Sequence, residues 1–336
     1  MAQNKSLKKA GAGLKQYGMM IMLIVVYLLF AIITKGKNLT PMNINNLIMQ
    51  NGYVVILAVG MLLCVLTGNV DLCVGSVVAS TGAVAGTLII DFGWSAPAAM
   101  AAALAVGALF GVFVGFFVAY VDIPPFIVTL ATMLIYRSVA QYYLRTLRLS
   151  IYNMDGTLSA YDPFYKFGQY KVAGLIPMAG VILILVTVLM VFMSTNTKFG
   201  RSIYAIGSNE RAARLAGINV EWTQVAVYTI TGLLCGVSTF MWLAMNGSVD
   251  PATIGKSNEM YAIAAVVIGG ISMSGGKGKL LGVLFGAMSY TIIDKIIASM
   301  GLDALINDTI KGSILLLAVF IQIAIPAIRA KFSKSH

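Results

Sequence analysis

The chain has 336 residues, of which 59% are hydrophobic and only 10% are charged. Soluble proteins carry roughly a quarter of charged residues, so this composition excludes an ordinary soluble fold. Apolar runs of about 20 residues, long enough to cross the core of a bilayer, recur along the whole chain. The net charge of +11 is divided among many short polar intervals, so it indicates membrane topology rather than nucleic-acid binding.

Residues that could bind a metal or carry catalysis are sparse. The single histidine is His336, and Cys64, Cys73 and Cys235 lie in apolar context without CxxC spacing. Such cysteines are typical of small buried hydrophobic side chains. We therefore expect no metal site and no cofactor bound by this chain, and an intramembrane enzyme is the least favoured alternative.

The apolar runs predict an all-α polytopic membrane protein with about ten transmembrane spans. The expected spans are 17–34, 51–67, 75–90, 96–120, 126–144, 175–193, 222–245, 260–271, 281–300 and 305–325. The run 260–271 is short for a full crossing, so we expect a short or re-entrant segment there. A single transmembrane domain then covers residues 1–336.

Lysine and arginine collect in alternate polar intervals, which orients the chain because cytoplasmic segments carry the excess of positive charge. An even number of spans places both termini, 1–16 and 326–336, in the cytoplasm together with the basic loop 195–220. The longest polar interval, 147–173, is then extracytoplasmic. The bias is imperfect, because several basic residues fall outside: Lys35, Lys37, Arg145, Arg148, Lys166, Lys171 and Lys256.

The stretch Lys198 to Val220 is dense in basic charge and can form its own short helix. Asn209 can cap that helix, and Glu210 suits its positive end. Glu210 and Arg214 pair at i,i+4, and Gly217 can end the helix. The residues expected on the opposite face are apolar: Ala212, Leu215 and Ala216. We expect this helix to be displayed at the membrane surface to an outside partner; an ordinary cytoplasmic loop is the alternative.

Asp71 lies between two apolar runs, where a carboxylate is costly unless it faces a partner or water. Gly68, Asn69 and Gly75 around it allow the helix to break. A polar break inside a bilayer is tolerated only if it is buried in protein or lines a cavity. Asp71 therefore either faces a solute path or caps a helix at the cytoplasmic surface, and both interpretations stay open.

Two stretches echo each other. Leu62 to Ser76 and Leu233 to Ser257 both contain LLC followed by G-x-V-D. Transporters often carry internal repeats, and breaks in corresponding helices tend to mark the substrate path. A chance match at this length is the alternative.

Other polar groups in apolar context allow local interpretations. The hydroxyl of Thr129 is of the kind that usually bonds a carbonyl in the preceding turn. Glu259 stands at a helix start, where it suits the dipole. The glycine-rich stretch 269–279 is no phosphate-binding loop, because Met273 and Leu280 occupy positions where that motif needs Gly and Ser or Thr. If transport is driven by ATP, a separate subunit must hydrolyse it.

Four segments together resemble the ribose-type sugar ABC importer permeases. They are GNVDLCVGSVVASTGAVAG, IPPFIVTLATMLIYRS, FGRSIYAIGSNERAARLAGINV and AVVIGGISMSGGKG, in this order within residues 45–320. The second segment is most similar to the multiple-monosaccharide and xylose branches, with galactoside permeases close behind. Asn69, Cys73 and the pair Pro124-Pro125 depart from the family pattern, which leaves the lining of the path, and so the sugar, open.

The resemblance implies a permease subunit of a binding-protein-dependent ABC importer of a monosaccharide, in the inner (plasma) membrane of a bacterium. The implied partners are an extracytoplasmic sugar-binding protein, a sugar-import ATPase with two fused nucleotide-binding halves that holds the ATP and Mg, and a second permease copy in a homodimer. The implied coupling helix for the ATPase contains Ser208, Asn209, Glu210, Arg211, Ala212, Ala213, Arg214 and Gly217.

Asp71 and Gly75 match a signature near the translocation path of that family. We extend the candidate path to further residues around the polar breaks: Asn69, Ser76, Phe126, Thr129, Asn258 and Glu259. Closure of the ATPase is expected to push the coupling helix and rock the spans around this path. Because the binding protein selects the solute, few direct sugar contacts are expected.

Two other transport functions stay open. The first is an ABC importer of a nucleoside or another small polar solute, since the same architecture could pass it. The second is a proton- or sodium-coupled secondary transporter, which needs an intramembrane carboxylate for the ion. Its candidates are Asp71, Asp294 and Glu259.

Overall fold

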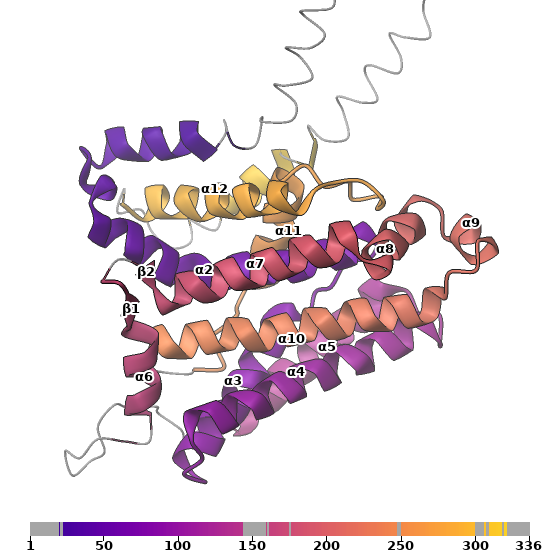
Figure 1. The fold of residues 1–336 in the computed structure, drawn as a ribbon, viewed down its shortest axis with the longest axis horizontal. Coiled ribbons are helices and arrows are strands. Elements are labelled where there is room, and N and C mark those ends of the chain that lie inside the picture. The colour runs from indigo at the N-terminus through magenta and orange to yellow at the C-terminus, as the bar shows by residue number, and fades with distance from the viewer. Residues whose placement is uncertain are drawn as a thin grey trace, which may run out of the picture.

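The computed structural model describes residues 20, 23–143, 159, 161–174, 176–246, 250–299, 306, 309–317 and 319–320. The predicted terminal segments 1–16 and 326–336, with Arg145 and Arg148, lie outside the described residues. Most of the described chain is helical, and the long helices run side by side along the long axis of the molecule (Figure 1).

The elements follow one another in a simple order. They are the helix Leu23–Ile33, the 3₁₀ turn η1 (Lys37–Leu39), α2 (Pro41–Leu66), α3 (Val74–Ile90), α4 (Ala96–Ala119), α5 (Pro125–Tyr143), α6 (Asp162–Gln169), β1 (Lys171–Val172), β2 (Ile176–Pro177), α7 (Met178–Asn196), α8 (Lys198–Ser208), α9 (Glu210–Leu215), α10 (Val220–Asn246), α11 (Asn258–Ile268) and α12 (Leu280–Ser299). The prediction of a helical membrane fold is confirmed. The exception is the antiparallel pair β1–β2, where Lys171 lies opposite Pro177.

Most predicted spans agree with a helix to within a few residues, but the second begins earlier than expected. The second span was expected to begin at residue 51, whereas α2 begins at Pro41. Proline is favoured in the first turn of a helix, and the Thr40 hydroxyl accepts a hydrogen bond from the backbone N–H of Asn43 at 3.4 Å. The polar residues of 41–50 therefore belong to the helix rather than to the break before it.

Five described helices are long and apolar enough to cross a membrane by length and composition: α2, α4, α7, α10 and α12. The helices Leu23–Ile33, α3 and α11 are apolar but shorter. α11 has 11 residues, about half of what a crossing needs, so the prediction of a short segment at 260–271 is confirmed. The total of ten spans stays a prediction, because much of 305–325 lies outside the described residues.

The core forms around α2, whose most apolar stretch is 83% buried, against 28% for α7. α10 packs against α4 through glycines. A Cβ on Gly107 would overlap the carbonyl oxygen of Gly232, and one on Gly111 would overlap that of Tyr228. These helix backbones therefore approach as closely as small residues allow, which is the usual basis of helix association in a bilayer.

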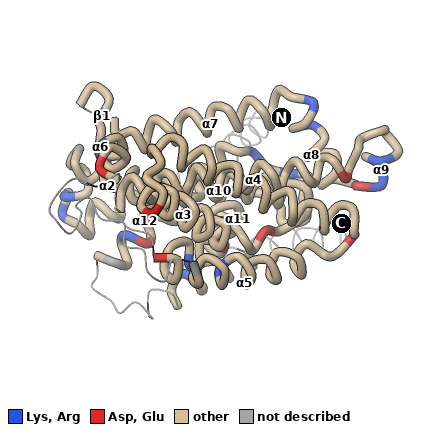
Figure 2. Tube along the Cα trace, turned by 90° about the horizontal axis from the view of Figure 1, so that it is seen from below, with Lys and Arg blue, Asp and Glu red and all other residues tan. Residues whose placement is uncertain are grey.

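The two ends of the molecule differ. α8 and α9 project at one end, whereas α6, β1 and β2 gather at the other (Figure 1). Basic and acidic residues stand together on α9, as Figure 2 shows. The polar segments that could meet partners are thus separated by the full length of the long helices.

Candidate functional site

The polar segment after α7 forms two short helices rather than the single helix expected from the sequence. The Thr197 hydroxyl caps α8 by accepting the N–H of Gly200 at 3.0 Å. Asn209 is extended, with φ −165°, and its Oδ1 accepts the N–H of Ala212 at 2.9 Å. Asn209 thus ends α8 and caps α9, and Gly217 with φ +80° follows α9 as a stop. The predicted cap and stop are confirmed.

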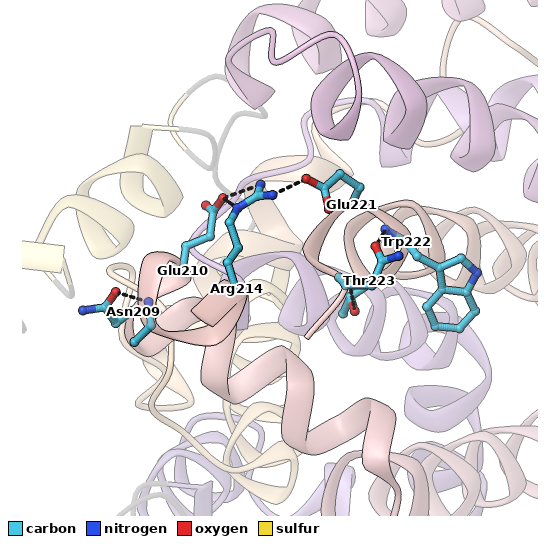
Figure 3. Close-up of polar contacts among 8 residues, drawn as sticks. Asn209, Glu210, Arg214, Glu221, Trp222 and Thr223 are labelled. Atoms are coloured by element: carbon cyan, nitrogen blue, oxygen red, sulfur yellow. Dashed lines mark hydrogen bonds and ion pairs between the residues drawn. The ribbon is translucent and has the colours of Figure 1, made fainter. Parts of the chain in front are cut away.

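Arg214 lies between two carboxylates, as Figure 3 shows. Its Nη2 is 3.0 Å from Glu210 Oε1, which confirms the predicted i,i+4 pair. Its Nη1 contacts Glu221 at the start of α10, a partner that the sequence interpretation missed. The hydrogen bonds to Glu221 and then to Glu210 raise the pKa of the Arg214 guanidinium. Exposed pairs contribute at most about 1 kcal/mol, so their main effect is to orient α9 against α10.

The apolar face of α9 is open. Ala213 is the residue that packs inward, against Ile206 and Val220. The residues expected on the apolar face are exposed in the isolated chain: Ala212, Leu215 and Ala216. Leu215 is 86% exposed, which is unusual for a leucine in an ordered helix and leaves an apolar side chain available to a partner.

The α8 segment touches the end of α2 and the loop after α11. The N–H of Gly276 donates to the carbonyl of Leu66 at 2.9 Å, and a Cβ on Gly207 would overlap both groups. The Tyr204 hydroxyl donates to the carbonyl of Gly278 at 2.9 Å. Burial raises the pKa of Tyr204, so its hydroxyl keeps the proton that it donates. Displacement of α8 would therefore act directly on both segments.

Past Leu66 the chain leaves the helix and reaches α3 through a break at residues 67–73. Asp71 in this break is 4% exposed, and its Oδ1 accepts the N–H of Cys73 at 2.8 Å. The Cys73 thiol lies beside Asp71 and beside Thr132 on α5. Asp71 thus closes a local turn before α3 from a buried position, but it does not cap the helix, whose N-cap residue is Cys73 and which has no side-chain cap.

A second break precedes α11, at the turn formed by residues 250–257, here called the 250–257 turn. Asp250 Oδ1 accepts the N–H of Ala252 at 3.0 Å, the same interaction that Asp71 makes with Cys73. Arg137 Nη1 on α5 donates to the carbonyls of Pro251 at 3.0 Å and Ile254 at 2.6 Å. Both aspartates of the repeated G-x-V-D sequence therefore fold the backbone in the same local way.

The two breaks meet. A Cβ on Gly75, in the first turn of α3, would overlap the carbonyl oxygen of Gly255 and lie 2.7 Å from Glu259 Oε2 in the first turn of α11. Helix N-termini carry partial positive charge, so the Glu259 carboxylate suits this position. Non-helical backbone at membrane depth is tolerated where it is buried in protein or lines a cavity. We call this juncture the Gly75–Glu259 contact.

The structure therefore brings together Gly75 and Glu259 among the predicted path residues. Asn69 Nδ2 and Ser76 Oγ are buried and have no hydrogen-bond partner among the described residues. Asn258 is buried and faces the Tyr53 hydroxyl. Such polar groups in the interior are open to further hydrogen bonds.

Phe126 and Thr129 lie farther away on α5. Phe126 is 59% exposed and stands about 16 Å along the helix from Arg137. The Thr129 hydroxyl donates to the carbonyl of Pro125 at 2.8 Å, which confirms the local interpretation of this side chain. A role for these residues in a solute path stays a prediction.

Three residues that join these segments were not predicted: Arg137, Tyr204 and Gly207. The sequence indicated Arg137 most clearly, because it is the only charged residue within α5. Ionisable residues in apolar helices usually face the protein interior. The close approach of Gly207 to Leu66 depends on segments far apart in the sequence and had no local signal.

A helical membrane protein in which two interrupted helices meet inside, with a polar segment at one end coupled to both, has the architecture of a transport protein. Residues 43–323 match the family described as branched-chain amino acid transport system / permease component. The chain therefore belongs to this family of multi-pass membrane permeases, and it is a transport component rather than an enzyme.

Relatives match over nearly the whole chain. The chain is 31% identical to the xylose transport system permease protein XylH of Haemophilus influenzae, over 94% of this chain and 98% of that protein. It is 38% identical to the ribose import permease protein RbsC of Escherichia coli K12, over 89% and 92%. It is 31% identical to the fructose import permease protein FrcC of Rhizobium meliloti, over 90% and 84%.

Proposed function

We propose that this chain is the permease subunit of an ABC importer that carries a monosaccharide. The observation that carries the proposal is the nearly full-length similarity to permeases named for xylose, ribose and fructose. An importer permease of this family implies an ATPase and an extracytoplasmic solute-binding protein as partners. The ATP and Mg belong to that ATPase, with two fused nucleotide-binding halves, and two permease copies form a homodimer in the bacterial inner membrane.

In this proposal α8 and α9 form the contact with the ATPase in the cytoplasm. The exposed Leu215 provides an apolar contact, and Arg214 holds α9 against the start of α10. A displacement of α8 would move the end of α2 through Gly207 and the loop after α11 through Tyr204. Both segments are connected to the helices that meet at the Gly75–Glu259 contact. In this proposal that contact is where the solute path opens to one side of the membrane or the other.

Two alternatives make different demands on the residues. The family description names branched-chain amino acids, so a small polar solute other than a sugar, including a nucleoside, is the competing cargo. An ion-coupled transporter needs a carboxylate that can take up an ion. Asp294 is paired with Lys311 at 2.5 Å and Asp71 accepts the N–H of Cys73, which disfavours both for that role.

The test is to purify the tagged permease from native membranes under gentle detergent and identify the proteins that accompany it. Recovery of an ATPase and a solute-binding protein supports the proposal, and the isolated binding protein can be screened with xylose, ribose, fructose, nucleosides and amino acids. Proteoliposomes with all three components should then take up the selected sugar only with ATP. Uptake by the permease alone, driven by an ion gradient, would overturn the proposal.

A further inference from the structure

A polar cavity of about 690 Å³ lies between the N-terminal helix Leu23–Ile33 and the helices that follow. Its walls come from residues between 30 and 38, from residues between 43 and 50 on α2, and from Lys295 and Ser299 near the end of α12. The N-terminal helix, indigo in Figure 1, runs beside α12. Pockets that bind small molecules typically measure about 300–1,000 Å³, so the space is large enough for a ligand.

The cavity lies at the end of the molecule away from α8 and α9. Leu66 at the last turn of α2 contacts the α8 side through Gly276, and the 26 residues of α2 span about 39 Å. The cavity at the first turns of α2 is therefore at the opposite surface of the membrane region. Residues 30–38 precede the matched region 43–323, so part of the site is built outside the family match.

The described lining of the cavity is positively charged. It contains Lys35, Lys37 and Lys295 and, among the residues that the structure describes, no carboxylate. Lys295 Nζ donates to Gln50 Oε1 at 2.6 Å, which holds the ammonium in place and leaves two of its three N–H groups for other acceptors. Membrane proteins usually carry their excess of lysine on the cytoplasmic side. The lysines of this cavity lie at the opposite end, and a local function would explain their presence there.

Asn38 supplies an independent sign of a ligand. It lines the same cavity, is 5% exposed, and its Nδ2 has no hydrogen-bond partner among the described residues. Its Oδ1 accepts the Thr34 hydroxyl at 2.9 Å. Turning the amide over would occupy only one of its two N–H groups, so a donor remains free in either orientation. A buried donor left unpaired is costly, and a turn of this side chain toward the cavity would let an anionic oxygen satisfy it.

One wall of the cavity is apolar. Phe30, Ile33 and Leu47 line it beside the lysines, and the N-terminal helix turns further apolar side chains outward, with Ile32 at 73% exposed. We propose that this cavity binds an anionic phospholipid, with its phosphate on the lysines and Asn38 and its acyl chains along the apolar wall. Inorganic phosphate would match the cations but not the apolar wall. The assignment to the outer leaflet rests on the orientation in the proposed function.

The test uses the purified full-length permease alone in detergent, with bound lipid counted by native mass spectrometry. The probes are phosphatidylglycerol, phosphatidylcholine with the same acyl chains, and inorganic phosphate. Lys35→Gln with Lys37→Gln is compared with a charge-matched control, Lys166→Gln with Lys171→Gln, because the control lysines lie at the same end on α6 and β1 but outside the cavity.

Phosphatidylglycerol should bind the wild type and the control at least about tenfold tighter than phosphatidylcholine, since each lysine near an anionic lipid adds roughly fivefold. The cavity variant should lose most of this preference. Asn38→Asp, which keeps the size and the acceptor for Thr34, should lower phosphatidylglycerol affinity without affecting phosphatidylcholine.

Equal binding of the two lipids, an equal loss in the two lysine variants, or displacement of the lipid by millimolar phosphate would overturn the proposal. The measurement needs no ATPase and no solute. Failure of lipid binding is therefore distinguishable from failure of the proposed transport function.

Discussion

Gly75 and Gly255 stand so close that each occupies the place where the other would carry a side chain. A Cβ on either residue would overlap the carbonyl oxygen of the other. Gly75 lies in the first turn of α3 and Gly255, with φ +67°, in the 250–257 turn before α11. The end of one repeated stretch, residues 62–76, therefore packs against the end of the other, residues 233–257, and this mutual fit holds the starts of α3 and α11 together.

Gly75→Ala should disturb this juncture. Overpacking of a filled interior costs about 1–3 kcal/mol, and the new methyl group also meets Glu259 Oε2. We expect a lower unfolding temperature in detergent and reduced solute uptake. The matched control is Gly312→Ala, in a helix with nothing near the added Cβ, which should stabilise by about 0.5–1 kcal/mol. Equal behaviour of the two variants would show that the close approach is not required.

The exposed apolar face of α9 gives a prediction about the ATPase. Leu215→Glu should leave the folded permease intact, because the side chain is 86% exposed and such surface changes shift stability by within about 0.5 kcal/mol. It should weaken ATPase binding by about tenfold or more if Leu215 is an anchor that partner contact desolvates. Copurification of the ATPase and solute-stimulated ATP hydrolysis are the measurements.

Glu210→Gln, also on α9, separates loss of charge from loss of the apolar contact, because it removes one exposed pair and keeps Leu215. The buried Ala213 should not be used for the same purpose, since a carboxylate there would separate α9 from Ile206 and Val220. Unchanged ATPase binding by the Leu215→Glu permease would rule out α9 as the apolar contact.

The contacts of α8 predict a defect in coupling without a defect in assembly. Tyr204→Phe removes the hydrogen bond to the Gly278 carbonyl, which costs about 0.5–1.5 kcal/mol. We expect the ATPase to remain bound and basal ATP hydrolysis to continue, while solute-stimulated hydrolysis and uptake fall together. Ser202→Ala is the control, because that exposed hydroxyl donates only within α8, to Lys198. A parallel fall in ATPase binding would contradict the coupling role and indicate a structural one.

A partly buried ion pair joins α12 to the helix that contains residues 309–317. Lys311 is 7% exposed; its Nζ lies 2.5 Å from Asp294 Oδ1 and 3.0 Å from the Tyr261 hydroxyl on α11. Removing one partner of a fully buried pair costs about 3–5 kcal/mol, and replacing both costs far less. The Asp294 side chain is 30% exposed, so Asp294→Asn and Lys311→Met should each lower the unfolding temperature by less than that cost implies, and the double variant should recover much of the loss.

The outcome for ion coupling follows from the same variants. If Asp294 carried a transported ion, the double variant would be stable but would lose uptake entirely. If the pair is structural, uptake should return with stability. Measuring uptake and unfolding temperature on all three variants separates these results.

Much of this architecture could be predicted from residues that are close together in the sequence. Apolar length predicted where most of the long described helices lie, because a helix that crosses a bilayer must satisfy its own backbone within about 20 residues. Asn209, Glu210 and Gly217 predicted the α9 cap and stop, since those interactions close within one turn of chain. The family could be recognised from four segments, and residues 43–323 match its model.

The contacts between segments far apart in the sequence could not be predicted in this way. Gly75 meets Gly255, Gly207 meets Leu66, and Arg137 reaches Pro251 only because distant helices pack side by side. The start of α2 at Pro41 was missed because its first turns are polar, and helix propensity there outweighs the hydropathy that marks a span. Local chemistry thus specifies each helix and its caps, whereas the packing of helices far apart in the chain decides which buried polar groups face one another.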